Sequence, residues 1–411
     1  MIRPRATSQV AVIVLLLSLL RGVAAQSGPF VAGQFRGRIA YCADGNHNDP
    51  DDWVASPVAL AILAEAGLAE RLVHFNYNCI LPQTNPDWEQ IHAASVLGTA
   101  QRYGYDRARF FDCQKQRTEM LASLAQTISA SSEDDPLYCI VAGPVEVPYL
   151  GIQQADPSRR PHVYCISHSR WNDGFARNYT FTHTKRSVIE SGVNWVQIRD
   201  QNLLLSKSPY GRPAPPEAFA DFFWLRDAPE TRLRWLWERL VLSTRPDPSD
   251  AGMAYFLISG DEQCDPAKLR SLLADHQRPA PTVARGTIRL EAENFQKLSG
   301  FEVEDRNDRA ASHRLCVRLT TPAGGSIRTP FREPFAAAGR CDLEVRYSAA
   351  SECGLTLRVG NTFERRWRAP GSTGGWTSHR ALDLELRWGD EIAVEAHGDV
   401  QLDYVQLERR P

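Results

Sequence analysis

Residues Gly37 to Leu63 read GRIAYCADGNHNDPDDWVASPVALAIL and contain the most informative pattern of the chain. An apolar run leads in, an apolar helix-like run leads out, and four aspartates lie between them: Asp44, Asp49, Asp51 and Asp52. Like charges a few ångströms apart raise each other's pKa and resist ionising together. Such a cluster is tolerable when a cation binds in it. The alternative is a solvated loop whose aspartates cap the following helix.

The same alternation of strand-like and helix-like runs continues up to residue 276. Strand-like apolar runs lie at 38–44, 72–78, 108–113, 137–143, 162–169 and 194–200, and helix-like runs include 56–69, 117–131 and 230–243. Because such alternation is typical of parallel sheets covered on both faces, the sequence predicts an α/β domain with a mostly parallel sheet over residues 33–276. Ligands of these sheets bind at the carboxyl ends of the strands. Asp44, His168 and Asp200 all lie near predicted strand ends.

The pattern changes across a Pro/Ala-rich stretch without periodicity, QRPAPTVARG at 277–286, whose residues 277–285 are predicted to form a linker. Short alternating strands separated by turns follow it, including DLEVRYSAA, LTLRVGN and VQLDYVQLER. Residues 286–411 are therefore predicted to form an all-β sandwich of the jelly-roll-like kind.

The N-terminus and the composition restrict where the chain works and what it binds. Two arginines, an apolar run of 11 residues and small residues at Val23 and Ala25 predict a signal peptide over residues 1–25. The mature protein is then secreted or periplasmic, with no membrane attachment after cleavage. A net charge of −2 gives no electrostatic support for binding a nucleic-acid polymer. Nine cysteines are compatible with an oxidising compartment but reveal no disulfide pairing.

Several polar side chains outside the aspartate cluster are candidates for proton transfer or ligand contact. The candidate general acids are His47, His168 and His183, each of which has a hydrogen-bonded structural role as its alternative. Trp171 and Asn172, in the stretch ISHSRWNDGF at 166–175, are candidate ligand contacts, with packing and a plain turn as the alternatives. His74 lies inside an apolar strand and is predicted to belong to the core.

The opening stretch resembles the start of the nucleoside hydrolase family, whose first strand ends in an Asp-x-Asp-x-x-x-Asp-Asp motif. The stretches LYCIVAGPVEVPYLGIQQA at 137–155 and RPDPSDAGMAYFLI at 245–258 are similar to later turns of that family. The resemblance implies a calcium ion held by Asp44, Asp52, Asp250 and the carbonyl of Ala142, which suits the oxygen ligands that calcium prefers. It also implies that a strand-end aspartate accepts the proton of the attacking water.

Two departures from the family pattern bear on these roles. The spacing from Asp44 to the aspartate pair is longer by three residues, so Asp49 is an alternative strand-end base and ligand. Asp51 is assigned to substrate binding, together with Trp171 and Asn172. Ser249 stands before Asp250, where the family has its leaving-group histidine, and this argues against ordinary release of a nucleobase.

The C-terminal region resembles carbohydrate-binding modules of families 6 and 35, which open with a Glu-Ala-Glu strand and close on a Leu-Asp-Tyr-Val strand. Here these strands are IRLEAENF at 288–295 and VQLDYVQLE at 400–408. Strand alternation predicts that Glu291 and Glu293 share a face, and the resemblance implies a structural calcium ion held by them and by Asp403. Ordinary surface acids are the alternative. Candidate sugar-stacking rings are those of Tyr347, Trp367 and Trp376.

Together these patterns predict a secreted, calcium-dependent, glycosidase-like hydrolase that acts on a glycan or glycoside and is targeted by a carbohydrate-binding module. One alternative is a non-catalytic glycan-binding protein that keeps only the metal site of a vestigial nucleoside-hydrolase domain. A secreted purine or pyrimidine nucleosidase is another. The binding interpretation gains if His47, His168 and His183 all point away from the aspartates.

Overall fold

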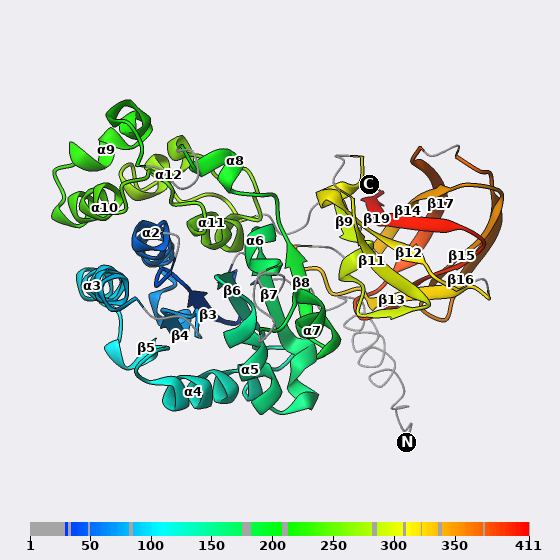
Figure 1. The fold of residues 1–411 in the computed structure, drawn as a ribbon, viewed down its shortest axis with the longest axis horizontal. Coiled ribbons are helices and arrows are strands. Elements are labelled where there is room, and N and C mark those ends of the chain that lie inside the picture. Colours follow the sequence, from blue (N-terminus) through cyan, green and yellow to red (C-terminus); the bar gives the residue numbers. More distant parts are fainter. Residues whose placement is uncertain are drawn as a thin grey trace, which may run out of the picture.

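The structure is a computed structural model, and it describes residues 29–31, 34–47, 50–81, 85–174, 182–207, 213–281, 286–306, 310–321, 323–335, 339–372 and 375–410. The predicted signal peptide, Asp49 and the last four residues of the predicted linker lie outside these ranges. Figure 1 shows an α/β domain built from the first part of the chain beside a β-sandwich built from the last part. Every helix within the described ranges is too short or too polar to serve as a membrane span.

The α/β domain contains eight strands and a larger number of helices among its described residues. Its strands are β1 (Phe30–Val31), β2 (Gln34–Phe35), β3 (Arg38–Ala43), β4 (Leu72–Tyr77), β5 (Phe110–Asp112), β6 (Leu137–Ala142), β7 (Val163–Ser167) and β8 (Asn194–Gln197). Its α-helices are α2 (Asp52–Glu65), α3 (Pro86–Arg102), α4 (Arg117–Ser129), α5 (Glu146–Gln154), α6 (Arg170–Asp173), α7 (Lys185–Glu190), α8 (Asn202–Leu205), α9 (Phe223–Arg226), α10 (Thr231–Leu242), α11 (Ala251–Ser259) and α12 (Pro266–Leu273). Short 3-10 helices are η1 (Ala69–Arg71), η2 (Arg107–Arg109), η3 (Pro157–His162) and η5 (Pro216–Phe222).

The central sheet is parallel and has six strands in the order β5-β4-β3-β6-β7-β8, which confirms the predicted parallel sheet. The strand order reverses at β3, because β4 and β5 lie on one side of it and β6, β7 and β8 on the other. Open α/β sheets bind ligands at the carboxyl ends of the strands next to such a reversal. Ala43 pairs with Ala142 at that point, so Asp44 begins the loop directly above the crevice.

Helices cover both faces of this sheet, as the continuous burial of its strands requires. One core includes residues of α2, α3, α10, α11 and α12, and the other includes residues of α4, α5 and α7. Helix α2 begins at Asp52, four residues before the predicted start at 56, because the Asp51 carboxylate accepts a hydrogen bond from the Asp52 N–H at 3.0 Å and caps the helix. All residues of α11 are buried, so the helix lacks the amphipathic period by which sequence patterns reveal helices.

His74 lies in the core of this domain, as its place in an apolar strand predicts. Its Nε2 accepts a hydrogen bond from the Asn76 amide at 3.1 Å, and its Nδ1 donates to Ser123 Oγ at 3.0 Å, a pairing that only the neutral ring can make. Burial lowers the pKa of His74 from 6.5 to about 3.

Acid is therefore expected to destabilise the domain through His74. In the unfolded chain His74 gains a proton below about pH 6.5, but in the folded domain it does so only near its lowered pKa. The contribution of the neutral ring to stability is therefore fully present above pH 6.5 and is lost as the pH decreases. Between pH 6.5 and 5 the expected loss is about 2 kcal/mol. Urea unfolding at both pH values should show that the free energy of unfolding of His74→Gln falls by about 2 kcal/mol less than that of the wild type. An equal loss of stability in both proteins would contradict the proposed role of His74.

The second domain is a sandwich of two antiparallel sheets, in agreement with the predicted fold. Its strands are β9 (Thr287–Glu291), β10 (Lys297–Ser299), β11 (Phe301–Asp305), β12 (Leu315–Leu319), β13 (Gly325–Pro330), β14 (Gly339–Ala349), β15 (Cys353–Val359), β16 (Phe363–Ala369), β17 (Thr377–Leu386), β18 (Glu391–His397) and β19 (Val400–Arg409). Two 3-10 turns are η6 (Ala292–Asn294) and η7 (Ser312–Arg314). One sheet has the order β10-β13-β18-β15-β16 and the other β11-β12-β19-β14-β17, with β9 also paired to β19. The first and last strands of the domain, β9 and β19, are thus neighbours.

Candidate functional site

A polar cavity of about 550 Å³ opens at the carboxyl end of the parallel sheet. The residues that line it come from the loops after β3, β7 and β8 and from the turn before α11. Sequence reasoning proposed six of them: Asp44, Asp51, His168, Trp171, Asn172 and Asp250. The fold therefore brings together, at the strand-order reversal, side chains as distant in the chain as Asp44 and Asp250.

Three aspartates form a compact group at this cavity. Carboxylate oxygens of Asp44, Asp51 and Asp52 all lie within 4.8 Å of one another. The Asp44 N–H donates to Asp52 Oδ2 at 3.2 Å and to the carbonyl of Ala142 at 3.1 Å, so strand end and helix start are held together. The Ala142 carbonyl keeps a second lone pair for another partner. Asp51 caps α2, so the helix-cap interpretation holds for that residue and not for the group as a whole.

The turn after Asp44 is possible only with glycine. Gly45 adopts a φ of +75°, a left-handed conformation that side chains with a Cβ disfavour. A Cβ atom at this position would also lie 2.6 Å from Nδ1 of His92. The close approach lets the chain reverse at once after the strand and brings Asp44 and Asp52 to the same place.

The electrostatics of the group fit a bound cation. Burial, followed by the neighbouring Asp44 carboxylate, raises the pKa of Asp52 well above its usual range. Burial and the charges of Asp250 and Asp52 likewise raise the pKa of Tyr41, whose hydroxyl is buried without a hydrogen-bond partner. Converging carboxylates beside an orphaned hydroxyl are what a hard divalent cation such as calcium would stabilise.

Asp250 lines this cavity, and His168 orients its carboxylate. His168 Nε2 lies 2.7 Å from Asp250 Oδ1, and Nδ1 lies 3.2 Å from the Gln201 N–H and 3.6 Å from Asp200 Oδ1. Burial acts to lower the pKa of His168, but the two carboxylates outweigh it and raise the pKa to about 9. In the neutral ring, Nδ1 accepts the Gln201 N–H, so the proton lies on Nε2, and in the charged ring Nε2 is protonated as well. The ring therefore donates Nε2–H to Asp250 in both protonation states. His168 thus positions Asp250, and both of its nitrogens are engaged.

The two other candidate histidines do not line the cavity. His183 Nδ1 lies 2.9 Å from Glu146 Oε2, and its ring stacks on Tyr149 at a centroid distance of 3.8 Å. His47 is half-buried in the loop after β3, and burial lowers its pKa. His183 therefore has the hydrogen-bonded structural role that was its alternative, and His47 is not among the described residues that line the cavity.

The cavity also contains residues that sequence reasoning missed. Arg245 and Asp247 are buried beside it, with Arg245 Nη2 3.6 Å from Asp247 Oδ2. Ser206 Oγ donates to Asp247 at 2.6 Å, and burial raises the pKa of this aspartate. Arg245 and Asp247 belong to the turn RPDPSD at 245–250, in which only Asp250 matches the family motif. Their closeness in sequence to Asp250 was the one signal that could have identified them.

A second acidic group lies in the β-sandwich. Ligand atoms of Glu291, Glu293 and His313 come within 4.8 Å of one another. Both carboxylate oxygens of Glu293 and one of Glu291 are buried without a hydrogen-bond partner. Burial raises the pKa of Glu293 to about 7. Orphaned buried carboxylates beside a histidine fit a cation here as well.

Two expectations about this second group need correction. Glu293 does not continue the strand, because β9 ends at Glu291 and Glu293 lies in the turn η6, so the convergence arises from that turn instead of strand alternation. Asp403 is not one of the three residues whose ligand atoms lie within 4.8 Å of one another, although its charge helps to raise the pKa of both Glu291 and Glu293. Its two oxygens accept hydrogen bonds from the Ser312 N–H, at 2.9 Å, and from the Arg346 guanidinium, and His313 is the third member of the compact group.

The three rings proposed to stack on sugars in the sandwich are all at least partly covered. Tyr347 is only 2% exposed and belongs to the core. Trp367 packs against the core and stacks on His379 at a centroid distance of 4.3 Å. Trp376 lies beneath the guanidinium groups of Arg306 and Arg346. These contacts favour a structural role for each ring.

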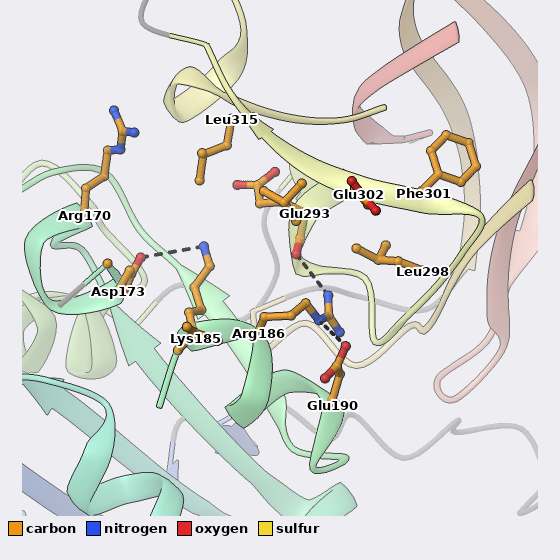
Figure 2. Close-up of a pocket in the computed structure, with 13 residues that line it drawn as sticks. Arg170, Asp173, Lys185, Arg186, Glu190, Glu293, Leu298, Phe301, Glu302 and Leu315 are labelled. Atoms are coloured by element: carbon orange, nitrogen blue, oxygen red, sulfur yellow. Dashed lines mark hydrogen bonds and ion pairs between the residues drawn. The ribbon is translucent and has the colours of Figure 1, made fainter. Parts of the chain in front are cut away.

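The two domains are held against each other by backbone-directed contacts from α7. The Arg186 guanidinium donates to the carbonyls of Glu293, Phe295 and Gln296 at 3.2, 2.7 and 2.7 Å. A cavity of about 400 Å³ lies at this boundary. Figure 2 shows Lys185 projecting from α7 with its ion pair to Asp173 drawn, and Glu293 on the sandwich side.

The chain matches no protein-family model. It is 30% identical over 244 residues to uncharacterized protein P22 of Formosa agariphila, a match that covers 55% of this chain and 84% of that protein.

Solved structures resemble the chain over about a third of its length. The C-terminal CBM6 of LamC, a marine laminarinase from Zobellia galactanivorans, is 14% identical, and the match covers 30% of this chain and 99% of that one with a TM-score of 0.26. The Podospora anserina GH26-CBM35 β-(1,4)-mannanase is 21% identical, and the match covers 31% of this chain and 29% of that one with a TM-score of 0.27. Likenesses of this size do not establish a shared function.

Proposed function

The chain belongs to the family of uncharacterized protein P22 of Formosa agariphila, and we propose that it is a calcium-dependent hydrolase of glycosidic bonds in a glycan or glycoside. The observation that carries the proposal is the group of Asp44, Asp51 and Asp52 at the strand-order reversal, opposite Asp250. The proposal includes a divergent nucleoside-hydrolase-like α/β domain, a glycan-binding sandwich with its own structural calcium ion, and export of the chain.

The residues that line the cavity or lie next to it divide into those that would hold the cation and those that would hold the sugar. Asp44, Asp52, Asp250 and the Ala142 carbonyl would hold calcium, while Asp51, Trp171 and Asn172 would contact substrate. A bound calcium ion would bind sugar hydroxyls and lower the pKa of a water molecule. The Trp171 ring, which lines the cavity, offers an apolar face to a sugar ring.

The chain's own residues would supply the proton transfer and the orientation. Asp44 lines the cavity and would accept a proton from the attacking water as general base. His168 would keep Asp250 in one orientation through the 2.7 Å contact. None of the three candidate histidines would protonate the leaving group, because His168 has both nitrogens engaged and neither His47 nor His183 is among the described residues that line the cavity.

This arrangement predicts a strong dependence on the leaving group. A positioned general acid is worth about 10²- to 10⁴-fold in rate, so without one the enzyme should hydrolyse 4-nitrophenyl glycosides at least about 100-fold faster than the methyl glycosides of the same sugars. Release should stop with a chelator and return with calcium. Release of base from inosine or uridine in preference to aryl glycosides would instead identify a nucleosidase.

A non-catalytic glycan-binding protein is the second candidate. The engaged nitrogens of His168 and the presence of Ser249 before Asp250 favour it. Calcium-dependent glycan binding without release from any aryl glycoside would support this candidate over hydrolysis.

A further inference from the structure

The aspartate cavity adjoins a second hollow that the β-sandwich helps to build. This hollow has a volume of about 630 Å³, and it shares His168, Arg170, Trp171, Asp200 and Leu203 with the aspartate cavity. Its far wall consists of His313, Arg314 and Leu315 of the sandwich. The sandwich therefore forms part of the site instead of serving only as a tethered module.

The segment that carries Arg314 is fixed in place. Ser312 donates its N–H to Asp403 and its hydroxyl to Glu291, each at 2.9 Å, and Leu315 is buried at the start of β12. His313 and Arg314 both adopt positive φ values, 47° and 59°, which non-glycine residues rarely do. Such conformations persist only where surrounding contacts impose them, so Arg314 projects from a defined position.

Of the cationic side chains that line this hollow, three have an acidic neighbour among the described residues. Lys185 lies 3.6 Å from Asp173, Arg170 lies 3.2 Å from Asp305, and His168 lies 3.6 Å from Asp200. The exposed guanidinium of Arg314 has no ion pair with any described residue. Because guanidinium groups bind carboxylates and other oxyanions through paired N–H donors, this wall favours an anionic ligand.

We propose that the hollow is an interdomain subsite for an anionic sugar, and that Arg314 selects the substrate by contacting its carboxylate or sulfate ester. One sugar unit would lie in the aspartate cavity and the acidic unit in the hollow. The proposal rests on the proposed function, since it extends the same cavity.

The test compares binding of three classes of methyl glycoside to the full chain by ligand-observed NMR. The probes are the glucuronide and galacturonide, the 6-sulfates of the glucoside and galactoside, and the neutral glucoside and galactoside. At least one acidic class should bind more tightly than the neutral class, and which acidic class does so identifies the substituent. Equal binding of all classes, or no binding of either acidic class, would overturn the proposal.

Variants of Arg314 then assign the preference to this residue. Arg314→Asn, whose side chain tolerates a positive φ, should weaken binding of the acidic glycoside by about 10-fold or more and leave neutral glycosides unchanged. Arg314→Lys should retain part of the preference. Arg318→Asn, which changes another exposed arginine that does not line the hollow, is the matched control. An unchanged preference in a folded Arg314→Asn variant would overturn the assignment.

Calcium binding, measured on the same samples, separates this inference from the proposed function. Calcium bound at the aspartates without any acidic preference would refute the subsite alone. An acidic preference that depends on Arg314, without calcium at the aspartates, would refute the calcium-dependent hydrolase alone.

Discussion

Replacing Asp52 by Asn is expected to abolish calcium binding at the strand-end cavity while leaving the metal-free protein at least as stable. Burial and the Asp44 carboxylate already disfavour the ionised form of Asp52, so the neutral amide relieves repulsion. Wild-type protein with calcium at 100 times its Kd should gain about 2.7 kcal/mol of stability from this site. The variant should gain none, and calcium-dependent hydrolysis should fall at least about 100-fold.

Calorimetric titration of the full chain measures this loss directly. The sandwich has its own candidate cation group, so the stoichiometry should fall by one in Asp52→Asn and not to zero. Asp112→Asn is the matched control, because Asp112 is also a buried aspartate at a strand end but lies outside the group. A destabilised metal-free Asp52→Asn variant with unchanged calcium stoichiometry would mean that the aspartates only cap the helix.

Replacing His168 by Gln is expected to weaken calcium binding 10- to 100-fold, the usual effect of losing a group that orients a metal ligand. The imidazole donates Nε2–H to Asp250, and its Nδ1 lies 3.2 Å from the Gln201 nitrogen, so its removal frees Asp250 to rotate. The rate at saturating calcium should then return to within a few-fold of the wild-type rate.

The calcium dependence of the rate distinguishes this positioning role from general acid catalysis. A general acid would cost about 10²- to 10⁴-fold in kcat even at saturating calcium, with calcium affinity unchanged. Hydrolysis of a 4-nitrophenyl glycoside, followed across a calcium titration, gives both quantities in one experiment. A decrease in kcat that calcium does not reverse would contradict the positioning role and indicate that His168 acts as a general acid.

The strands and the aspartate group could be predicted because their signals are local. A continuous apolar run followed by acidic residues places Asp44 and Asp52 at a strand end whatever the rest of the chain does. The structure agrees within a few residues for every predicted strand of the parallel sheet. Helix α11 could not be recognised from periodicity, because each of its faces is buried.

The parts of the site that could not be predicted depend on contacts between distant residues. The sequence does not reveal that both His168 nitrogens are engaged, since Asp250 lies 82 residues away and Gln201 lies 33 away. Arg346 of β14 forms an ion pair with Asp403 of the neighbouring strand β19, and the spacing of these residues in the sequence does not indicate that contact. The contribution of Arg314 to the hollow follows from domain docking, which neither domain encodes alone.

The calcium site at the strand ends is tested most directly by a crystal structure of the full chain grown with calcium, measured for anomalous signal. We expect a peak between Asp44, Asp52 and Asp250, about 2.3–2.6 Å from their carboxylate oxygens. A calcium peak at Glu291 and Glu293 with only ordered water at the aspartates would contradict it.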